Sequence, residues 1–339
     1  MTPHHGSKLL NPLVSVIIVN WNGERLLDAC LRSLLEQTYT NLEIIVVDNG
    51  SRDSSVHAIQ SRFSTVRVVE LPMNVGFTGG SIAGLQSSKG DFIALLNNDT
   101  RIENQCVAQL VETMLRDQRL GICVPKLIFE GSTNSLNSAG HGLTTAGVGF
   151  DRGVGTSLGG YTAPEFVFGA SAAAVLYRRA MLDDVGFFDE DFFIYDEDAD
   201  LNCRAQLAGW KCRFVPDAVV HHVGHATSGR LSDCHVYYHT RNLEFVWIKN
   251  MPAPLMLRYA HHKLAHEVGA FVYLCLRHGR WRPYLSAKFD ALRMLPSMIR
   301  KRRQVQAKRL VSDTDFRQLL TPVFRFDLIM QKARQLLVG

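Results

Sequence analysis

Short apolar runs alternate with amphipathic segments along the first part of the chain. The short apolar runs at residues 13–19, 42–47, 66–70, 92–96 and 121–125 predict strands, and the pattern of 42–47 and 92–96 is typical of buried strands. The segments 24–37, 53–62 and 103–117 carry apolar residues at helical spacing, and the glycines at 79–80 open a further helix. This alternation predicts βαβ units and a mostly parallel sheet flanked by helices.

The pattern changes twice further along. Residues 130–164 are rich in Gly, Ser, Thr and Asn, which predicts a long loop or lid. Strand patterns return at 171–177, 212–215 and 218–220, and beyond about Met251 the chain becomes helical and basic. We therefore expect a disordered segment at 1–12, an α/β domain at 13–250 and a helical, basic extension at 251–339.

Composition narrows the class of protein. The 339-residue chain is 46% hydrophobic and has a net charge of +5, which fits a globular protein. Between residues 277 and 309, eleven basic residues face one acid, Asp290, which favours contact with an anionic surface. The seven scattered cysteines indicate a reducing compartment rather than a disulfide framework. No apolar run reaches the ~18 residues of a spanning helix.

Polar side chains follow the predicted strands at the points where they end. Asn97, Asn98 and Asp99 come directly after strand 92–96, where a carboxylate and two amides suit a hard cation and its diphosphate. Asp48 ends another strand and could accept the imide N–H of uracil or thymine, or belong to an ordinary turn. Asn74 and Gly76 lead into a helix whose start favours anions.

A second acidic cluster occupies residues 196–200. A calcium loop is excluded because Leu201 and Leu207 stand where that loop requires Gly and Glu. A solvated helix start would explain Asp200, and would also suit Asp196. The apolar residues 192–195 beside the cluster favour a carboxylate tuned as a general base. His221 and His222 alternate along a strand, so only one of them is expected to face the site.

These motifs, in this order, resemble family 2 glycosyltransferases with the GT-A fold, especially bacterial rhamnosyltransferase-like members. The resemblance spans about residues 14–250. It rests on the segments 19–22 (VNWN), 47–53 (VDNGSRD), 74–77 (NVGF), 95–100 (LLNNDT), 168–170 (FGA), 186–189 (GFFD), 195–201 (YDEDADL), His222 and 241–242 (RN). It implies a Rossmann-like nucleotide-diphospho-sugar transferase fold with the C-terminal helical extension outside the firm match.

The resemblance also implies roles for individual residues. Asp198 would be the catalytic base, and Asp99 and His222 would hold Mg²⁺ or Mn²⁺. The first position of the metal motif is Asn97 where the family usually has Asp, which weakens the charge expected on the cation. The nucleotide would be bound by Asn20, Trp21, Asp48, Asn74, Gly76, Asn97 and Asn98. The donor or acceptor sugar would contact Phe168, Gly169, Ala170 and Glu197.

The implied activity is metal-dependent, inverting transfer of a sugar, rhamnose or a related hexose, from a dTDP- or UDP-linked donor. The acceptor would be a hydroxyl of a cell-surface glycan or of its polyprenyl-linked precursor, as in cell-wall or polysaccharide biosynthesis. We expect a cytoplasmic protein that is peripheral on the inner face of the cytoplasmic membrane. We expect no nucleic-acid partner, and the sequence leaves open whether the protein forms a homo-oligomer. The alternative is a non-catalytic regulatory module that binds nucleotide sugar or membrane.

Overall fold

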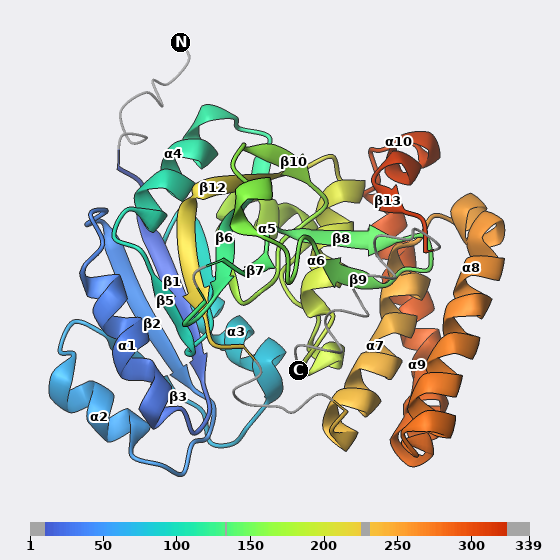
Figure 1. Cartoon of the computed structure of the whole chain (residues 1–339), viewed down its shortest axis with the longest axis horizontal. Helices are drawn as coiled ribbons and strands as arrows, with labels where there is room; N and C mark the ends of the chain where they lie inside the picture. The colour runs from blue at the N-terminus through green and yellow to red at the C-terminus, as the bar shows by residue number, and fades with distance from the viewer. Residues whose placement is uncertain (1–10, 133, 225–230, 324–339) are drawn as a thin grey trace.

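The computed structural model describes residues 11–132, 134–224 and 231–323, which form a twisted sheet covered by helices and extended by a helical C-terminal region (Figure 1). The strands of the large sheet lie in the order β10-β12-β6-β11-β4-β1-β2-β3. The strands are β1 Val14–Asn20, β2 Leu42–Asp48, β3 Arg67–Glu70, β4 Phe92–Leu96, β5 Thr100–Ile102, β6 Leu120–Phe129, β7 Leu136–Ser138, β8 His141–Thr144, β9 Gly149–Asp151, β10 Glu165–Val167, β11 Ala174–Arg178, β12 Lys211–His222 and β13 Leu320–Thr321. The helices are α1 Glu24–Leu35, α2 Ser55–Arg62, α3 Gly76–Ser87, α4 Cys106–Arg116, α5 Arg179–Val185, α6 Glu197–Leu207, α7 Asp233–Asn250, α8 Ala253–Phe271, α9 Trp281–Ala307 and α10 Asp313–Gln318.

The first four main strands confirm the predicted α/β class. β3, β2, β1 and β4 are all parallel neighbours, and β4 is buried along its whole length. Their apolar runs are explained by this position, because helices cover both faces of the sheet. β11 runs antiparallel between β4 and β6, while β6 and β12 are parallel to each other. The carboxyl ends of β1, β2 and β4 therefore meet at one edge.

The prediction of a long loop at 130–164 is wrong, because this segment forms short strands. It contains β7, β8, β9 and a 3₁₀ turn, and β8 lies at the centre of a small sheet, β13-β8-β9. Apolar periodicity is hidden here because the strands are only three or four residues long. The two expected strands 212–215 and 218–220 are one strand, β12, whose register shifts between Val215 and Val219.

The C-terminal helices share a core with the rest of the protein. Leu255, Met298 and Phe316 pack in one buried cluster with Phe192 and Phe245. β13 also pairs with β8, so residues after the expected boundary at 250/251 complete the small sheet. In Figure 1 these helices form the right-hand side of the molecule, beside the sheet domain.

Two of the sequence expectations concern the ends of the chain and membrane spans. Residues 1–10 of the expected disordered segment lie outside the described residues, while the backbone carbonyls of Asn11 and Pro12 accept hydrogen bonds from Asn41 and Tyr39. Within the described ranges, none of the helices combines the length and the apolar character that crossing a membrane requires.

Candidate active site

Amide and carboxylate side chains interlock at the edge where β1, β2 and β4 end. Asn20 and Asp48 are register partners at the ends of β1 and β2, and Asn20 Nδ2 lies 3.4 Å from Asp48 Oδ1. Asn20 Nδ2 also donates to Ser55 Oγ at 3.0 Å, and Asn98 Nδ2 donates to Asn20 Oδ1 at 3.0 Å. Three residues predicted to bind the nucleotide are thus connected, as parallel strands require.

The other predicted nucleotide residues differ in what they expose. Trp21 follows β1 and is 42% exposed, so its ring is open to a ligand. Asp48 is only 4% exposed, and its Oδ2 accepts the Ser51 N–H at 3.1 Å. A base could reach Asp48 only through the remaining lone pairs of its carboxylate.

Asn74 and Gly76 form a structural turn at the start of α3. Asn74 Oδ1 accepts the Gly76 N–H at 2.8 Å, and Asn49 Oδ1 accepts the Val75 N–H at 2.9 Å. Gly76 has φ of +78°, and a Cβ there would lie 2.3 Å from the Phe193 carbonyl oxygen. The turn therefore needs glycine. The N–H groups of residues 75 and 76, expected to face an anion, donate to protein side chains instead.

Asp99 and His222 come together from β4 and β12. β5 pairs with the end of β12, which sets Thr100 opposite His222, and His222 Nε2 lies 3.2 Å from Asp99 Oδ1. His222 Nδ1 is 3.2 Å from Asn137 Oδ1, so an Nδ1–H donor leaves the Nε2 lone pair directed at Asp99. His221 faces Glu103 on the other side, as strand alternation predicts.

This pair fits a hard divalent cation. Asp99 Oδ1 is buried and accepts no hydrogen bond from any residue that the structure describes, although His222 Nε2 is close by. Two ligands at 2.0–2.1 Å from an octahedral cation lie about 3 Å apart, close to the separation seen. Within the described residues, no group of three or more His, Cys, Asp and Glu gathers, so other ligands would come from the diphosphate or water.

The acidic cluster follows a segment with unusual backbone geometry. Phe193, Tyr195 and Asp196 all have positive φ, at 65°, 69° and 63°. Such geometry is costly for residues other than glycine and persists only where surrounding contacts enforce it. Here Asn242 Nδ2 donates to the carbonyls of Ile194 and Tyr195 at 2.9 and 2.7 Å. The segment is thereby held in place by α7.

Glu197 and Asp198 begin α6; Glu197 is buried, whereas 13% of the Asp198 side chain is exposed. Asp198 Oδ2 accepts the Ala172 N–H at 3.1 Å and its Oδ1 accepts the Ala199 N–H at 2.7 Å. Burial raises the pKa of Asp198 above its ordinary value. Burial and the neighbouring Asp198 raise the pKa of Glu197 well above its ordinary value. The two adjacent carboxyls are thus suited to different protonation states, with Asp198 the more readily ionised.

His141, which no sequence motif singles out, lies beside Asp198. Its Nδ1 is 3.9 Å from Asp198 Oδ2, and its Nε2 is 3.2 Å from Asp151 Oδ1. Burial lowers the pKa of His141, but the carboxylates of Asp198 and Asp151 outweigh that effect and raise it to about 9. Only the pairing of β8 with β9, which sets His141 opposite Asp151, creates this arrangement.

The backbone of Ala172 and Ala173 connects the two acidic motifs. Ala172 N–H donates to Asp198, and the next carbonyl, that of Ala173, accepts the Asn97 N–H at 2.9 Å. β11 then runs antiparallel beside β4. Asn97, at the start of the 97–99 motif, and Asp198 are consequently bonded to consecutive residues of one short segment.

Residues 168–170, expected to contact a sugar, make close contacts within the protein. Phe168 packs against Phe316 in the core, and Ala170 is fully buried. Asn202 bonds both backbone groups of Ala170, and a Cβ on Gly169 would lie 2.1 Å from the Asn202 side chain. This segment therefore positions Ala172, and through it Asp198.

Asp200 is not part of a solvated helix start. It is fully buried and lies 2.9 Å from both Lys249 Nζ and Arg204 Nε. Burial raises the pKa of Asp200, but these two cations outweigh this effect and lower the pKa to about 2. Asp196 lies 2.8 Å from His239 Nδ1. These two acids fasten α6 to α7.

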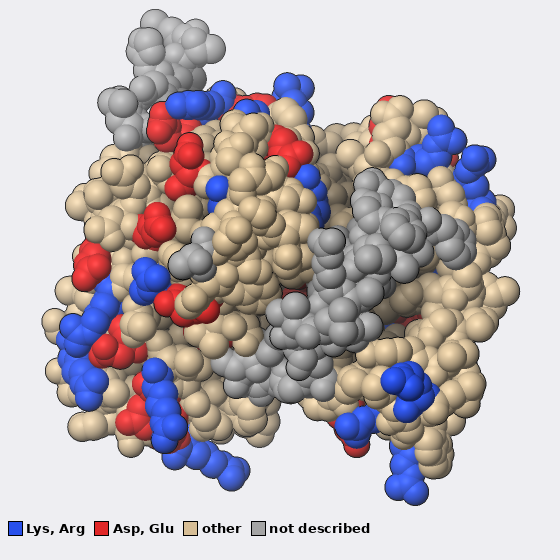
Figure 2. Space-filling model, in the orientation of Figure 1, with Lys and Arg blue, Asp and Glu red and all other residues tan. Residues whose placement is uncertain are grey.

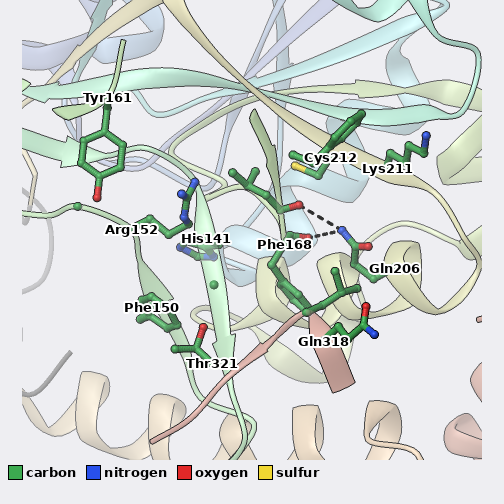
Figure 3. Close-up of a pocket in the computed structure, with 15 residues that line it drawn as sticks. His141, Phe150, Arg152, Tyr161, Phe168, Gln206, Lys211, Cys212, Gln318 and Thr321 are labelled. Atoms are coloured by element: carbon green, nitrogen blue, oxygen red, sulfur yellow. Dashed lines mark hydrogen bonds between the residues drawn. The ribbon is translucent and has the colours of Figure 1, made fainter. Parts of the chain in front are cut away.

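A cavity of about 500 Å³ lies against the small sheet (Figure 3). It is lined by Phe150, Tyr161 and Phe168, with Arg152, Lys211 and Gln206 as polar groups. Gln206 Nε2 is already bonded to the Phe168 carbonyl at 2.7 Å, and Arg152 to Glu165 at 2.8 Å. Of the site residues predicted from the sequence, only Phe168 lines this cavity. His141, which was not predicted, also lines it.

Comparison with known proteins gives consistent matches. The family model described as "Glycosyl transferase family 2" matches residues 15–186. An N-acetylglucosaminyl-diphospho-decaprenol L-rhamnosyltransferase of Mycobacterium tuberculosis is 27% identical over 297 residues, covering 80% of this chain and 87% of that protein. An N-acetylglucosaminyltransferase of Rhizobium meliloti is 29% identical over 225 residues, covering 62% of this chain and 50% of that protein.

Solved structures show the same architecture. The structure of GalNAc-T7 with UDP, GalNAc and Mn²⁺ has a TM-score of 0.56 at 18% identity, covering 71% of this chain and 50% of that one. Residues 1–349 of S. aureus TarS give a TM-score of 0.54 at 16% identity, covering 90% of this chain and 91% of that one. The likeness identifies the fold as GT-A. The chain spans only about half the length of the Rhizobium relative and of GalNAc-T7.

Proposed function

The chain belongs to glycosyl transferase family 2, and from this membership and the site geometry we propose that it is an inverting, metal-dependent glycosyltransferase. The donor would be a dTDP- or UDP-linked hexose, with rhamnose favoured by the name of the mycobacterial relative, which covers 80% of this chain. The acceptor would be a hydroxyl of a polyprenyl-linked precursor or of a cell-surface glycan.

One observation carries the proposal: consecutive residues Ala172 and Ala173 bond Asp198 and Asn97, respectively. A base and a diphosphate-binding motif must lie on either side of one sugar ring, so they must be held at a fixed separation. The short rigid segment before β11 supplies that constraint. Neither acidic motif alone would support transfer.

The nucleotide would lie at the ends of β1, β2 and β4. We assign Trp21 to the face of the base, because its ring is exposed there, and Asp48 to the imide edge. Asn20, Asn97 and Asn98 would shape the floor of this site, and Asn74 and Gly76 its far wall. The hydrogen bond from Asn98 Nδ2 to Asn20 Oδ1, and that from the Asn97 N–H to the Ala173 carbonyl, keep the floor in place before the ligand arrives.

Asp99 and His222 would hold Mg²⁺ or Mn²⁺ through the buried oxygen and the imidazole nitrogen that face each other. The cation would neutralise negative charge on the departing diphosphate. The Mn²⁺ in the GalNAc-T7 structure supports the proposal of a divalent cation. Since Asn97 replaces the usual first acid, this chain supplies one carboxylate fewer to the cation, and the affinity should depend strongly on the bound diphosphate.

Asp198 would accept the proton of the acceptor hydroxyl. The oxygen then bonds to the anomeric carbon while the carbon–oxygen bond to the diphosphate breaks, and the electron pair leaves with the nucleotide. One displacement from the opposite face inverts the configuration, without a carboxylate nucleophile. His141 would stabilise the ionised form of Asp198, and Glu197 would remain protonated and able to donate a hydrogen bond to a sugar oxygen.

We extend the proposal to the inner face of the cytoplasmic membrane, where a polyprenyl-linked acceptor is found. The basic stretch at 277–309 supports a peripheral contact of the protein with anionic lipid.

Calorimetric titration of UDP and dTDP with Mg²⁺, Mn²⁺ or EDTA tests the nucleotide site. Wild type and Asp198→Asn should bind one diphosphate in a metal-dependent way, whereas Asp99→Ala should not. Asp198→Asn should then lose transfer by about 10²–10⁴-fold. If neither diphosphate binds under any condition, the result favours the alternative that the protein is a non-catalytic regulatory module.

A further inference from the structure

The α8–α9 hairpin places its charges inside and its apolar side chains outside. Lys263 on α8 lies 2.8 Å from Glu267 and 3.1 Å from Glu244 of α7. Lys288 on α9 bonds the same two carboxylates, and Tyr284 Oη donates to Glu267 at 3.2 Å. Burial raises the pKa of Glu267, but the two lysines outweigh this effect and lower the pKa to about 2. These ion pairs thus lie on the inner side of the hairpin, between α7, α8 and α9.

The outer faces of the two helices are apolar at helical spacing. On α8 and the π-helical turn that follows it, Val272–Arg277, the exposed apolar side chains are Leu257, Leu264, Val268, Phe271, Val272 and Leu276. On α9 they are Trp281, Leu285, Phe289, Leu292 and Ile299. In Figure 2 most of the right-hand part of the molecule, over α8, carries neither acidic nor basic side chains. A contiguous surface of this kind indicates an interaction site.

The charges that are exposed on this hairpin all have one sign. Between residues 253 and 310 there are only two acids, Glu267 and Asp290. Both point inward, since Asp290 accepts a hydrogen bond from Tyr237 Oη at 2.6 Å. Arg258, Arg277, Arg282, Arg293 and Arg300 are exposed. An apolar face bordered by arginines, with a tryptophan at the turn, has the chemistry of a helix lying in a membrane interface.

We propose that the outer faces of α8 and α9, together with the turn at 272–281, dock on an anionic lipid bilayer. The apolar side chains would enter the headgroup region and the arginines would contact lipid phosphates. A second copy of this chain would leave those arginines facing one another without acids, which is unfavourable. The inference rests on the proposed function only for the acceptor's location.

The docking face is rigidly joined to the candidate active site. Arg302 on α9 donates to the carbonyls of Ile248 and Met251 at 2.7 and 2.6 Å. Lys301, its neighbour, bonds Asp189 and Asp191, shortly before the segment with positive φ. A bilayer bound at α8 and α9 would therefore hold Asp198 at a fixed distance from the lipid surface.

Vesicle flotation of the full chain tests the surface. Wild type should bind phosphatidylcholine vesicles containing phosphatidylglycerol, and weakly or not at all those of phosphatidylcholine alone. Leu285→Glu/Phe289→Glu should reduce partition more than ten-fold, and Arg282→Gln about five-fold. Leu35→Glu is the matched control, since Leu35 on α1 is 50% exposed against 51% for Leu285. It should bind as wild type does.

Fluorescence of Trp281 provides a measurement that needs no disruptive variant. The emission of Trp281 is obtained by subtracting the fluorescence of Trp281→Phe from that of wild type. Brominated lipids in anionic vesicles should quench this emission. The proposal is overturned if wild type ignores anionic vesicles, if the double variant binds equally well, or if wild type is a dimer that the double variant makes monomeric. Nucleoside diphosphate binding without vesicles reports separately on the proposed function, and the surface variants should retain it.

Discussion

Lys301 Nζ lies 2.7 Å from Asp191 Oδ2, which joins the long helix α9 to the segment that leads into the acidic motif. The same ammonium bonds Asp189, which also accepts Lys249 Nζ at 2.5 Å. Residues 110 positions apart in sequence thus share one partly buried ion-pair network. The C-terminal helices consequently support the site as well as covering one side of the molecule.

Replacing Lys301 should loosen that segment. Lys301→Met removes one cation from two acids, and we expect a loss of about 1–3 kcal/mol in the free energy of unfolding. The turnover number should fall more than nucleotide affinity does, because the nucleotide residues lie at the other end of the site. Urea denaturation and steady-state kinetics measure both. Arg300→Met, at an exposed neighbouring position, should change neither the stability nor the kinetics when both are measured without lipid vesicles.

His141 should set the pH dependence of transfer. Asp198 acts as a base only when ionised, so kcat/KM should rise with pH as Asp198 loses its proton. The charged His141 lowers the pKa of Asp198, and His141→Gln should therefore shift this acid limb to higher pH.

The pH profile of His141→Gln distinguishes this effect from simple misfolding. A variant that only loses stability would lower activity equally at every pH. An unshifted acid limb in His141→Gln would contradict the role assigned to the imidazolium.

Asp200 should contribute to stability through its two cations. Asp200→Asn leaves Lys249 buried beside a neutral side chain, and should cost about 3–5 kcal/mol in the free energy of unfolding. Asp28→Asn, which alters the exposed pair with Arg32, is the control and should leave stability nearly unchanged.

The same ion pairs predict a direction for acid denaturation. Because the pKa of Asp200 is lowered to about 2 in the folded protein, its contribution of about 2 kcal/mol is present above the ordinary value of 3.8 and is lost as pH falls toward 2. Urea denaturation of wild type and Asp200→Asn at neutral and acid pH measures it. The difference in the free energy of unfolding between wild type and Asp200→Asn should become smaller at low pH. A difference that does not change with pH would contradict the ion-pair explanation.

Asn137 should affect the cation through His222. Asn137 Oδ1 lies 3.2 Å from His222 Nδ1, and removing it should weaken metal affinity by about 10–100-fold. Titration of Mn²⁺ into the diphosphate complex of Asn137→Ala measures this. Asn134→Ala is the control, because Asn134 bonds Ser157 and should leave the affinity unchanged. Equal affinity in both variants would show that Asn137 does not orient the imidazole.

The strands and helices of the first 125 residues were predictable because their local pattern is strong. Runs such as 92–96 are apolar throughout and end in polar residues, which sets the strand and the edge of the sheet at once. The side-by-side position of Asn20, Asp48 and Asn98 follows from parallel strands alone. The roles of the predicted site residues remain predictions.

Residues 130–164 and 168–170 were harder to interpret from sequence. β8 and β9 are too short to show a period, and β8 is stabilised partly by β13, which lies more than 170 residues away. The motif at 168–170 suggested a ligand contact, but Phe168 and Ala170 are buried by tertiary packing. A motif records which residues are needed, not whether they contact a ligand or a neighbouring side chain.

By itself the sequence determined the α/β class, the order of the elements and the two acidic motifs, since these depend on local periodicity and on residues at strand ends. Only the tertiary structure decided that His141 lies beside Asp198, that Asp200 is buried with Lys249, and that Lys301 is paired with Asp189. Those relationships join residues distant in sequence. Their geometry and pKa shifts arise from burial and from charges that come close only when the chain is folded.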